Sequence, residues 1–399
     1  MSELQYWLWL TLKKGLKNQK ITALLEYFGK PEAVYIADKE TLSQVSGLTR
    51  AELSSLCDKS MDKVSKVIAV CKKKGIKILT FDSPYYPQLL TKIYDPPYVL
   101  YARYRERIDL NEHMTISVVG TRKCSPYGAK MSGIIARDLA KEGVTVVSGM
   151  AEGIDGAANK GALTGGGVTV AVLGCGVDMC YPAMHKQLME DIINHGMVLS
   201  EYPPGTPAYP GNFKIRNRII TGLSYGTVIV EAPVRSGAVN SANWTIEQNR
   251  ELFVVPGDAT RGTAKGSNKM LVDGAKPVLS AEDVLFEYKE RFAEYLEHNR
   301  PAECDWPEDI DTEDIETDKI NEEQEAVLEE KEEPKRPQVS LDGLNENERA
   351  VVMLLTEEPR HIDQLAELGI SVGVLSATLT MLELKGYIKA LPGKFYCLK

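Results

Sequence analysis

Short runs of consecutive apolar residues, rich in β-branched side chains, recur through the middle of the chain, between residues 109 and 286. The runs are Ile116–Val119, Val144–Val147, Val168–Leu173, Met197–Leu199, Thr227–Val230 and Leu252–Val255. Stretches with helical spacing separate them, among them Tyr127–Lys141, Pro182–His195 and Gly237–Asn249. A strand that is apolar at every position is buried on both faces, and strands that alternate with helices form parallel sheets. The pattern therefore predicts an α/β fold with a Rossmann-like, doubly wound, mostly parallel sheet.

Two smaller blocks flank this region. Residues 1–80 show the three- and four-residue spacing of amphipathic helices and predict a small helical domain. The positions that carry this spacing are Ile21, Leu24, Leu25, Phe28, Val64, Val67, Ile68 and Val70. Residues 341–399 hold three helix-sized segments followed by two short strand-like runs, which is the layout of a winged helix. We therefore predict domains at 1–80, 81–286 and 341–399, with a helical extension and a linker over 287–340.

The charge of the chain is unevenly distributed. Its 399 residues carry a formal net charge of −9, which taken alone argues against a partner as anionic as nucleic acid. Residues 301–334, however, hold 16 acidic and 2 basic residues, and this composition predicts a disordered linker. The rest of the chain has 45 basic and 40 acidic residues, a net charge of +5, and residues 1–108 alone carry +7 (18 basic, 11 acidic). The whole-chain charge therefore does not exclude a nucleic acid.

Several classes of protein are disfavoured. No apolar run approaches the roughly 18–20 residues of a membrane-spanning helix, and the first apolar segment precedes its lysines, unlike a signal peptide. The 7 cysteines form no CxxC pair, so neither a disulfide framework nor a zinc site is expected. GxGxxG and Walker A motifs are absent, which argues against a bound NAD or ATP, and no catalytic motif is found. We expect a cytoplasmic protein without cofactor or metal that is not an enzyme.

Small-residue turns follow the predicted strands. Gly120-Thr121-Arg122-Lys123 leads from the first strand to a helix that opens at Ser125, and Ser148-Gly149 with Gly153 follows the second strand. Backbone N–H groups at such turns and at helix N-termini bind anions. Arg122 adds a guanidinium suited to phosphate. Asp155, beside the second turn, is predicted to cap a helix.

Three cations and an aromatic residue follow the fourth strand, in Phe213-Lys214-Ile215-Arg216-Asn217-Arg218. On a helix Lys214 and Arg218 share a face, while Arg216 points elsewhere. Ser236-Gly237-Ala238 forms one more turn after the fifth strand. The carboxyl ends of parallel strands form one rim, where open α/β sheets bind ligands. Several anion sites on one rim suit the repeated phosphates of a single nucleic-acid strand, with Phe213 either stacking a base or anchoring its own loop.

A series of motifs then resembles a known family. VVGTRKCSPYG, SGMAEGIDGAANKGAL, AVLGCGVDMCYP, LSEYPPG, FKIRNRIITGLS, VIVEA, SGA and VPGD occur in the order typical of the DNA-processing protein A (DprA/Smf) family. The approach segment Ile78–Pro87 and Asp95-Pro96-Pro97 are also similar to that family. The resemblance implies an extended Rossmann domain that binds single-stranded DNA and forms a homodimer. It also implies loading of the RecA recombinase onto strands covered by single-strand binding protein, as in natural transformation.

The resemblance assigns DNA-binding roles to particular residues, and the chain departs from the family pattern at Glu152, at Lys214 and over the segment Asn240–Trp244. The residues it assigns are Arg122, Ser148, Gly149, Lys214, Arg216, Asn217, Arg218, Ser236 and Gly237, and we add Lys123, Gly153 and Phe213 from their position in the same turns. Glu152 stands where the family usually has arginine, which places a carboxylate where a cation is expected. Lys214 stands where proline is commoner and adds a positive charge.

Alternative functions remain open. A nucleotide hydrolase of the phosphoribohydrolase type resembles this Rossmann variant, but its PGGxGTxxE motif is missing, and the nearest match is Ser236-Gly237-Ala238 with Glu247. A pure scaffold is a third possibility. Residues 20–57 resemble a helix-hairpin-helix or sterile-alpha-motif-like domain with its turn at Val45–Thr49, where phosphate binding and simple packing are equally consistent. Residues 371–384, the expected recognition helix of the winged helix, contain no basic residue, which favours a protein-interaction role over duplex recognition.

Overall fold

The computed structural model describes residues 1–301, 345, 348–349, 351–352, 360–361, 372–385, 387–391 and 395–398. The chain divides into two compact units, Met1–Asp318 and Lys319–Lys399, and each is described by itself. The acidic linker predicted at 301–334 lies, apart from Pro301, outside the described residues. Among the helices described, none combines the length and the apolar character needed to cross a membrane.

Six helices open the first unit and match the predicted N-terminal helical pattern. They are α1 (Glu3–Thr11), α2 (Asn18–Phe28), α3 (Pro31–Ile36), α4 (Lys39–Leu42), α5 (Arg50–Cys57) and α6 (Asp62–Lys74). The turn between α4 and α5 contains Gly47 at φ +78°, a left-handed conformation that favours glycine. α6 ends at Gly75, also left-handed (φ +67°), after three consecutive lysines that favour a helix C-terminus.

These helices share an apolar core with the sheet. Trp7 of α1 stacks on Tyr98, with the ring centroids 5.8 Å apart, and buried residues of α1, α2 and α6 continue into Tyr101 and Val198 of the sheet. The N-terminal helices therefore belong to the same compact unit as the sheet.

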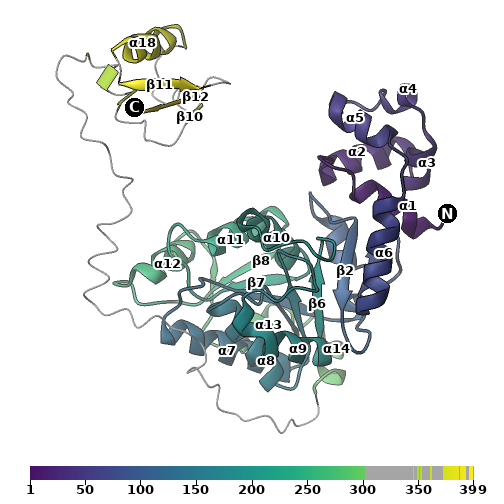
Figure 1. The fold of residues 1–399 in the computed structure, drawn as a ribbon. Coiled ribbons are helices and arrows are strands. Elements are labelled where there is room, and N and C mark those ends of the chain that lie inside the picture. Colours follow the sequence, from purple (N-terminus) through teal and green to yellow (C-terminus); the bar gives the residue numbers. More distant parts are fainter. Residues whose placement is uncertain are drawn as a thin grey trace. The chain divides into compact units, whose positions relative to one another are not determined.

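One sheet of nine strands organises the first unit, in the order β1-β2-β6-β5-β4-β3-β7-β8-β9 (Figure 1). The strands are β1 (Lys77–Thr80), β2 (Val99–Arg103), β3 (Thr115–Val119), β4 (Thr145–Ser148), β5 (Thr169–Val172), β6 (Met197–Ser200), β7 (Gly226–Ile229), β8 (Glu251–Val254) and β9 (Lys276–Pro277). From β6 to β9 all neighbours are parallel, with Ile116 of β3 opposite Val146 of β4 and Gly226 of β7. The predicted doubly wound, mostly parallel sheet is confirmed.

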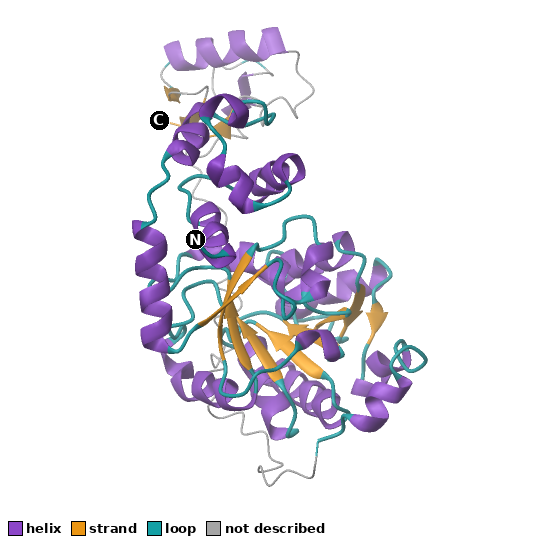
Figure 2. Ribbon diagram, turned by 90° about the vertical axis from the view of Figure 1, so that its right-hand side faces the viewer, coloured by secondary structure: helices purple, strands orange, loops and turns teal. Residues whose placement is uncertain are grey.

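Helices cover both faces of this sheet (Figures 1 and 2). One face carries α7 (Pro126–Lys141), α8 (Ile154–Thr164), α9 (Lys186–His195) and α13 (Ala281–Phe286), and the other carries α10 (Pro210–Gly222), α11 (Gly237–Glu247) and α12 (Lys265–Val272). Helix α14 (Ala293–His298) and short 3-10 turns at Gln88–Lys92, Leu110–Glu112, Ala183–His185 and Gly262–Ala264 complete the unit. The apolar strand residues are buried on both faces, as their uninterrupted runs predict.

The sheet is larger than the apolar runs predict. β1 and β2 come from the approach segment and extend the sheet in antiparallel fashion, Lys77 pairing with Ala102 and Tyr101 with Ser200. The sheet therefore begins at Lys77, four residues before the predicted start of the domain at 81. In the second unit, α18 (Val372–Leu384) precedes a hairpin of β11 (Ile388–Leu391) and β12 (Phe395–Leu398), and β10 (Arg360–His361) pairs with β12. This arrangement agrees with the predicted winged helix.

Candidate nucleic-acid interface

The loops singled out in the sequence meet at one rim of the sheet. They follow the carboxyl ends of β3, β4, β6 and β7, and the loop after β5, which was not singled out, lies at the same rim. The strands that follow β3 in the chain, β4 to β6, lie on one side of it, and β7 to β9 lie on the other. The winding direction of the sheet therefore reverses between β3 and β7. A doubly wound sheet binds its ligands at this rim and next to such a reversal.

The first predicted anion site is filled by the protein itself. Glu231 follows β7, is 4% exposed, and its Oε2 accepts a hydrogen bond of 2.8 Å from the backbone N–H of Ser125, at the N-terminus of α7. Its backbone carbonyl accepts from the N–H of Thr121 at 2.8 Å. An anion is favoured at a helix N-terminus, and Glu231 supplies it from within the chain. At the start of α7 the chain itself thus supplies a carboxylate where the sequence predicts a phosphate.

The second predicted turn is also occupied by a carboxylate. Asp155 is 6% exposed, and its carboxylate accepts from the backbone N–H of Gly149 in this turn and, at 3.4 Å, from that of Gly120 in the first turn. Burial raises the pKa of Asp155 above its ordinary value, although the nearby Arg216 charge opposes the shift. Asp155 lies in the first turn of α8 and the N-cap is Gly153, so the predicted capping role of Asp155 is wrong. The anion-binding backbone of both turns is thus used internally.

Ser148, Gly149 and Gly153 hold the rim together. The Ser148 hydroxyl donates to the carbonyl of Val118 at 2.6 Å and is buried. Gly153 has φ +73°, and a Cβ there would lie 2.6 Å from the carbonyl oxygen of Thr121, so only glycine fits. A Cβ on Gly149 would collide with the side chains of Asp155 and Arg216. These three residues shape the turns on which the exposed cations sit.

Arg216 and Phe213 link the rim to α10. Arg216 is 3% exposed and points into the sheet, where Nη1 donates to the carbonyl of Gly149 at 2.8 Å and to that of Val172. Burial lowers the pKa of Arg216, and the Asp155 carboxylate opposes that shift. Lys214 lies exposed on the helix surface, so Arg216 does point away from it, as helical spacing predicts.

A half-buried aromatic side chain lies among cations at this rim. The Arg122 guanidinium is 4.9 Å from the centroid of the Phe213 ring, and that of Arg216 is 5.8 Å from it. Tyr181, which is 42% exposed, packs against Phe213 with the ring centroids 5.1 Å apart. Gly174 lies beneath, since a Cβ there would come within 2.9 Å of the ring. Sequence reasoning missed Tyr181, although its place in the loop after β5 offered a signal.

The start of α11 forms a second part of the rim. Ser236 is the N-cap of α11, but its hydroxyl makes no capping bond and, among the residues described, has no partner although the atom is buried. Gly237 is exposed, with no heavy atom within 4 Å of a Cβ placed on it. Asn217 of α10 donates to the carbonyl of Gly237 at 3.2 Å, and the exposed Lys214 lies one turn earlier on α10. This helix N-terminus is open, has no acidic residue in its first turn, and has a lysine nearby.

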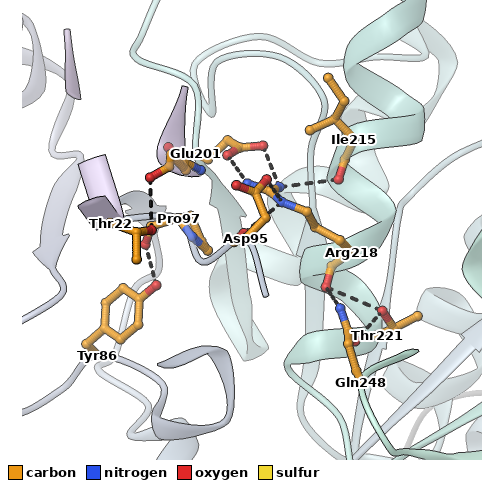
Figure 3. Close-up of polar contacts among 10 residues, drawn as sticks. Thr22, Tyr86, Asp95, Pro97, Glu201, Ile215, Arg218, Thr221 and Gln248 are labelled. Atoms are coloured by element: carbon orange, nitrogen blue, oxygen red, sulfur yellow. Dashed lines mark hydrogen bonds and ion pairs between the residues drawn. The ribbon is translucent and has the colours of Figure 1, made fainter. Parts of the chain in front are cut away.

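Arg218 has a different environment from that predicted for it (Figure 3). Its side chain is 2% exposed and forms a two-pronged ion pair with Glu201, with N···O distances of 2.8 and 2.7 Å. Its Nε also donates to the carboxylate of Asp95 at 2.8 Å. Burial alone lowers the pKa of Arg218, but the carboxylates of Glu201 and Asp95 raise it above its ordinary value. The geometry leaves Arg218 no surface for a DNA phosphate, so a direct contact by this residue is not supported.

The described rim therefore presents four exposed basic side chains, Arg122, Lys123, Lys214 and Arg235, around an aromatic pair and an open helix N-terminus. The exposed Glu152 is the carboxylate closest in sequence to the second turn. Within the described ranges, His, Cys, Asp and Glu side chains form no group of three or more that could hold a metal ion. Chemically, the surface offers stacking and phosphate contacts.

Comparison with known proteins agrees with this arrangement. Residues 77–289 match the family model described as DNA recombination-mediator protein A, and residues 333–394 match the DprA winged helix domain. The chain is 32% identical over 406 residues to Protein Smf of Synechocystis, covering 99% of this chain and 98% of that protein. It is 36% identical over 277 residues to DNA processing protein DprA of Streptococcus pneumoniae, covering 69% of this chain and 95% of that protein.

A solved structure shows the same fold. The X-ray structure of DNA processing protein A from Streptococcus pneumoniae superposes with a TM-score of 0.64 at 33% identity, covering 71% of this chain and 97% of that one. The family model spans more than half of the present chain, and the Smf relative is similar along nearly its whole length. The chain therefore belongs to the DNA recombination-mediator protein A (DprA/Smf) family.

Proposed function

We propose that this protein is a recombination mediator that binds single-stranded DNA along the rim of the sheet and acts without catalysing a reaction. The observation that carries the proposal is the position of Phe213, whose ring centroid lies 4.9 Å from the Arg122 guanidinium and 5.8 Å from that of Arg216, and which packs against the exposed Tyr181. Proteins that bind single strands combine aromatic stacking platforms with cations that follow the backbone.

The two parts of the rim flank the first turns of α10, which supplies Phe213 to one and Lys214 and Asn217 to the other. A strand that stacks a base on the aromatic pair has the N-terminus of α11 available for a phosphate. Ser236 supports this assignment, because its buried hydroxyl has no partner among the described residues and an anion would accept a hydrogen bond from it. A ligand with several phosphates makes use of both parts, whereas a single nucleotide makes use of one.

The hydrolase alternative fits the geometry poorly. Its closest sequence match pairs Ser236-Gly237-Ala238 with Glu247, but Glu247 is the last residue of α11 and lies about 15 Å along the helix from its start. Glu231, the carboxylate at the rim, is already bound to the N-terminus of α7. Incubation with nucleoside monophosphates provides the check, since steady release of free base would contradict a function limited to binding.

Fluorescence anisotropy with labelled oligothymidylate, titrated with salt, tests DNA binding. Phe213→Ala should weaken binding by roughly tenfold, because stacking contributes about 1–3 kcal/mol per base. Arg122→Ala should reduce the magnitude of the log–log salt slope by about 0.7, the value for one neutralised phosphate on a single strand. Arg107→Ala is the matched control. Arg107 is also an exposed arginine over an aromatic ring, 3.8 Å from the Tyr85 centroid. It lies before the N-terminal end of β3, however, at the opposite end of the strand from the rim. Equal effects of the Arg122 and Arg107 changes would refute the rim assignment.

Family membership and the rim together support a proposal about the partners. We infer that the protein forms a homodimer and loads the RecA recombinase onto strands coated with single-strand binding protein, in the cytoplasm where these partners act. A strand-exchange assay on coated single strands, with and without this protein, measures loading. Acceleration that is lost with Phe213→Ala supports the proposal, and wild-type protein that binds DNA without accelerating exchange would limit the function to strand protection.

A further inference from the structure

A face of helix α6 carries a row of lysines that the proposed function does not yet use. Lys63, Lys66, Lys73 and Lys74 are all exposed, and we call them the α6 lysine face. Residues three, seven and eleven positions apart lie on one side of an α-helix, which places these side chains together. The opposite side of α6 packs into the core through Val64 and Cys71, so the lysine face points outward.

Specific contacts define both ends of this face. At its C-terminal end, Lys74 forms a 2.6 Å ion pair with Asp178, which lies in the loop after β5 at the rim and also accepts from the backbone N–H of Gly205 at 2.8 Å. At its N-terminal end, Lys63 lines a small pocket together with Trp9, Lys13 and Lys14. The distance from Lys63 to Lys74 along the helix is about 16 Å. The face therefore runs from the rim to the N-terminal helices, along the helix that Figure 1 shows beside β2.

The positive charge of the α6 lysine face is largely uncompensated by acidic side chains. Within the described part of the chain, Lys63, Lys66 and Lys73 form no ion pair. Two further ammonium groups, those of Lys13 and Lys59, lie 4.5 and 4.9 Å from the centroid of the Trp9 ring. Both donate to backbone carbonyls, so these hydrogen bonds neutralise neither charge.

The acidic groups near this path are few and in part already engaged. Asp58 accepts from the backbone N–H of Ser60 at 2.9 Å, Asp62 begins α6, and Asp178 is paired with Lys74. Burial lowers the pKa of Lys13, and the charge of Lys63 lowers it further, while Asp58 opposes both effects. The cations repel one another here, which costs stability and favours an anionic ligand over an empty surface.

We propose that the α6 lysine face extends the DNA path, so that a single strand leaving the rim past Asp178 continues along α6 toward the lysines around Trp9. The extension rests on the proposed function at the rim. Its ligand is the sugar-phosphate backbone, because lysines bind phosphate as point charges and the face offers no planar fork or ordered donor set that would read a base. A longer strand therefore gains affinity from α6, whereas a strand short enough to fill only the rim does not.

The test compares two oligothymidylates, of about five and about 30 nucleotides, which bracket most single-strand site sizes. The variant Lys63→Gln/Lys66→Gln/Lys73→Gln removes three charges and keeps residues of similar helix propensity. The control Lys30→Gln/Lys39→Gln/Arg50→Gln removes three exposed charges from the same domain, at the starts of α3, α4 and α5. Urea unfolding of both variants shows that each is folded.

We expect the α6 variant to bind the long oligonucleotide roughly tenfold more weakly, with a salt slope smaller in magnitude by about 2, and the short one as wild type does. The control should bind both as wild type does. Unchanged binding of the long oligonucleotide overturns the extension, and so does equal weakening on both lengths, because the lysines would then act at the rim. If the wild type binds neither oligonucleotide, the rim function itself fails, a result distinct from failure of the extension alone.

Discussion

Replacing Arg218 by methionine should destabilise the first unit by about 3 kcal/mol. The change keeps most of the side-chain volume but removes the guanidinium that pairs with Glu201 and Asp95. Breaking a buried ion pair by removing one partner costs about 3–5 kcal/mol, since the other charge stays buried without compensation. The Glu201 and Asp95 side chains retain 13% and 23% exposure, so water screens part of the penalty and the lower end of that range applies.

Urea unfolding followed by tryptophan fluorescence measures this loss. With a slope near 3 kcal/mol per molar, at the upper end of the usual range because the unit is large, the midpoint should fall by about 1 M. The matched control is Arg261→Met, which breaks the ion pair with Asp258, where the side chains are 53% and 54% exposed and 3.7 Å apart. An exposed pair contributes about 0–1 kcal/mol, so this midpoint should barely move.

A second substitution separates the charge from the packing. In Arg218→Met/Glu201→Gln one of the two uncompensated carboxylates is gone while Asp95 remains, and we expect about 1–2 kcal/mol of the lost stability to return. A loss below about 1 kcal/mol in Arg218→Met, or a double variant less stable than the single one, would refute the reasoning. The backbone carbonyl of Arg218 also accepts from Gln248 at 2.9 Å, which holds α10 to the end of α11 (Figure 3). Arg218→Met keeps this backbone bond but loses the side-chain pairs that tie α10 to Asp95 and Glu201, so α10 should shift and DNA affinity should also fall.

Three further results are expected. Gly153→Ala should lower the free energy of unfolding in urea by about 2 kcal/mol or more, because φ is +73° and backbone carbonyls crowd the new methyl group. Gly237→Ala adds a methyl group in open space and should leave stability unchanged or slightly higher. Equal effects of the two changes would contradict this reasoning. Glu152→Arg should tighten binding of oligothymidylate several-fold and steepen the salt slope by about 0.7 in anisotropy titrations, and an unchanged slope would place residue 152 away from the strand. Burial raises the pKa of the Cys124 thiol to about 12. At pH 8 an alkylating reagent should therefore modify the exposed Cys57 of the native protein and leave Cys124 unmodified. Peptide mass spectrometry measures both modifications.

The buried parallel strands could be predicted because each is apolar along its length and bounded by turn residues. The run at 168–173, for example, contains β5, which is buried throughout. β2 carries an apolar run of the same kind, buried over Val99–Ala102, which the sequence reasoning overlooked. β1 could not be predicted in this way, because Lys77–Thr80 is an edge strand with no fully buried residue. Its place in the sheet depends on pairing with Val99–Arg103, some twenty residues later, and such pairing leaves no local signal.

The rim was predicted in outline but not in its internal contacts. Helical spacing correctly separates Lys214 from Arg216, since that depends only on local geometry. It does not distinguish an arginine that meets solvent from one that meets a carboxylate, and Arg218 is paired with Glu201, 17 residues earlier, and Asp95, 123 residues earlier. Likewise, the bond from Ser125 to Glu231 spans 106 residues. Glycine turns indicate where backbone N–H groups gather, whereas the group that accepts from them is decided by tertiary structure.

The carboxylates of Glu231 and Asp155 act as built-in ligands of the two glycine turns, and this has a consequence for selectivity. Free nucleotides carry the same phosphate chemistry as a DNA strand, and a turn with open N–H groups would bind them one at a time. With both turns occupied from within, what remains at the rim is a set of separate, individually weak contacts. Only a polymer engages several of these contacts at once, so discrimination between a strand and the surrounding pool of monomers rests on avidity.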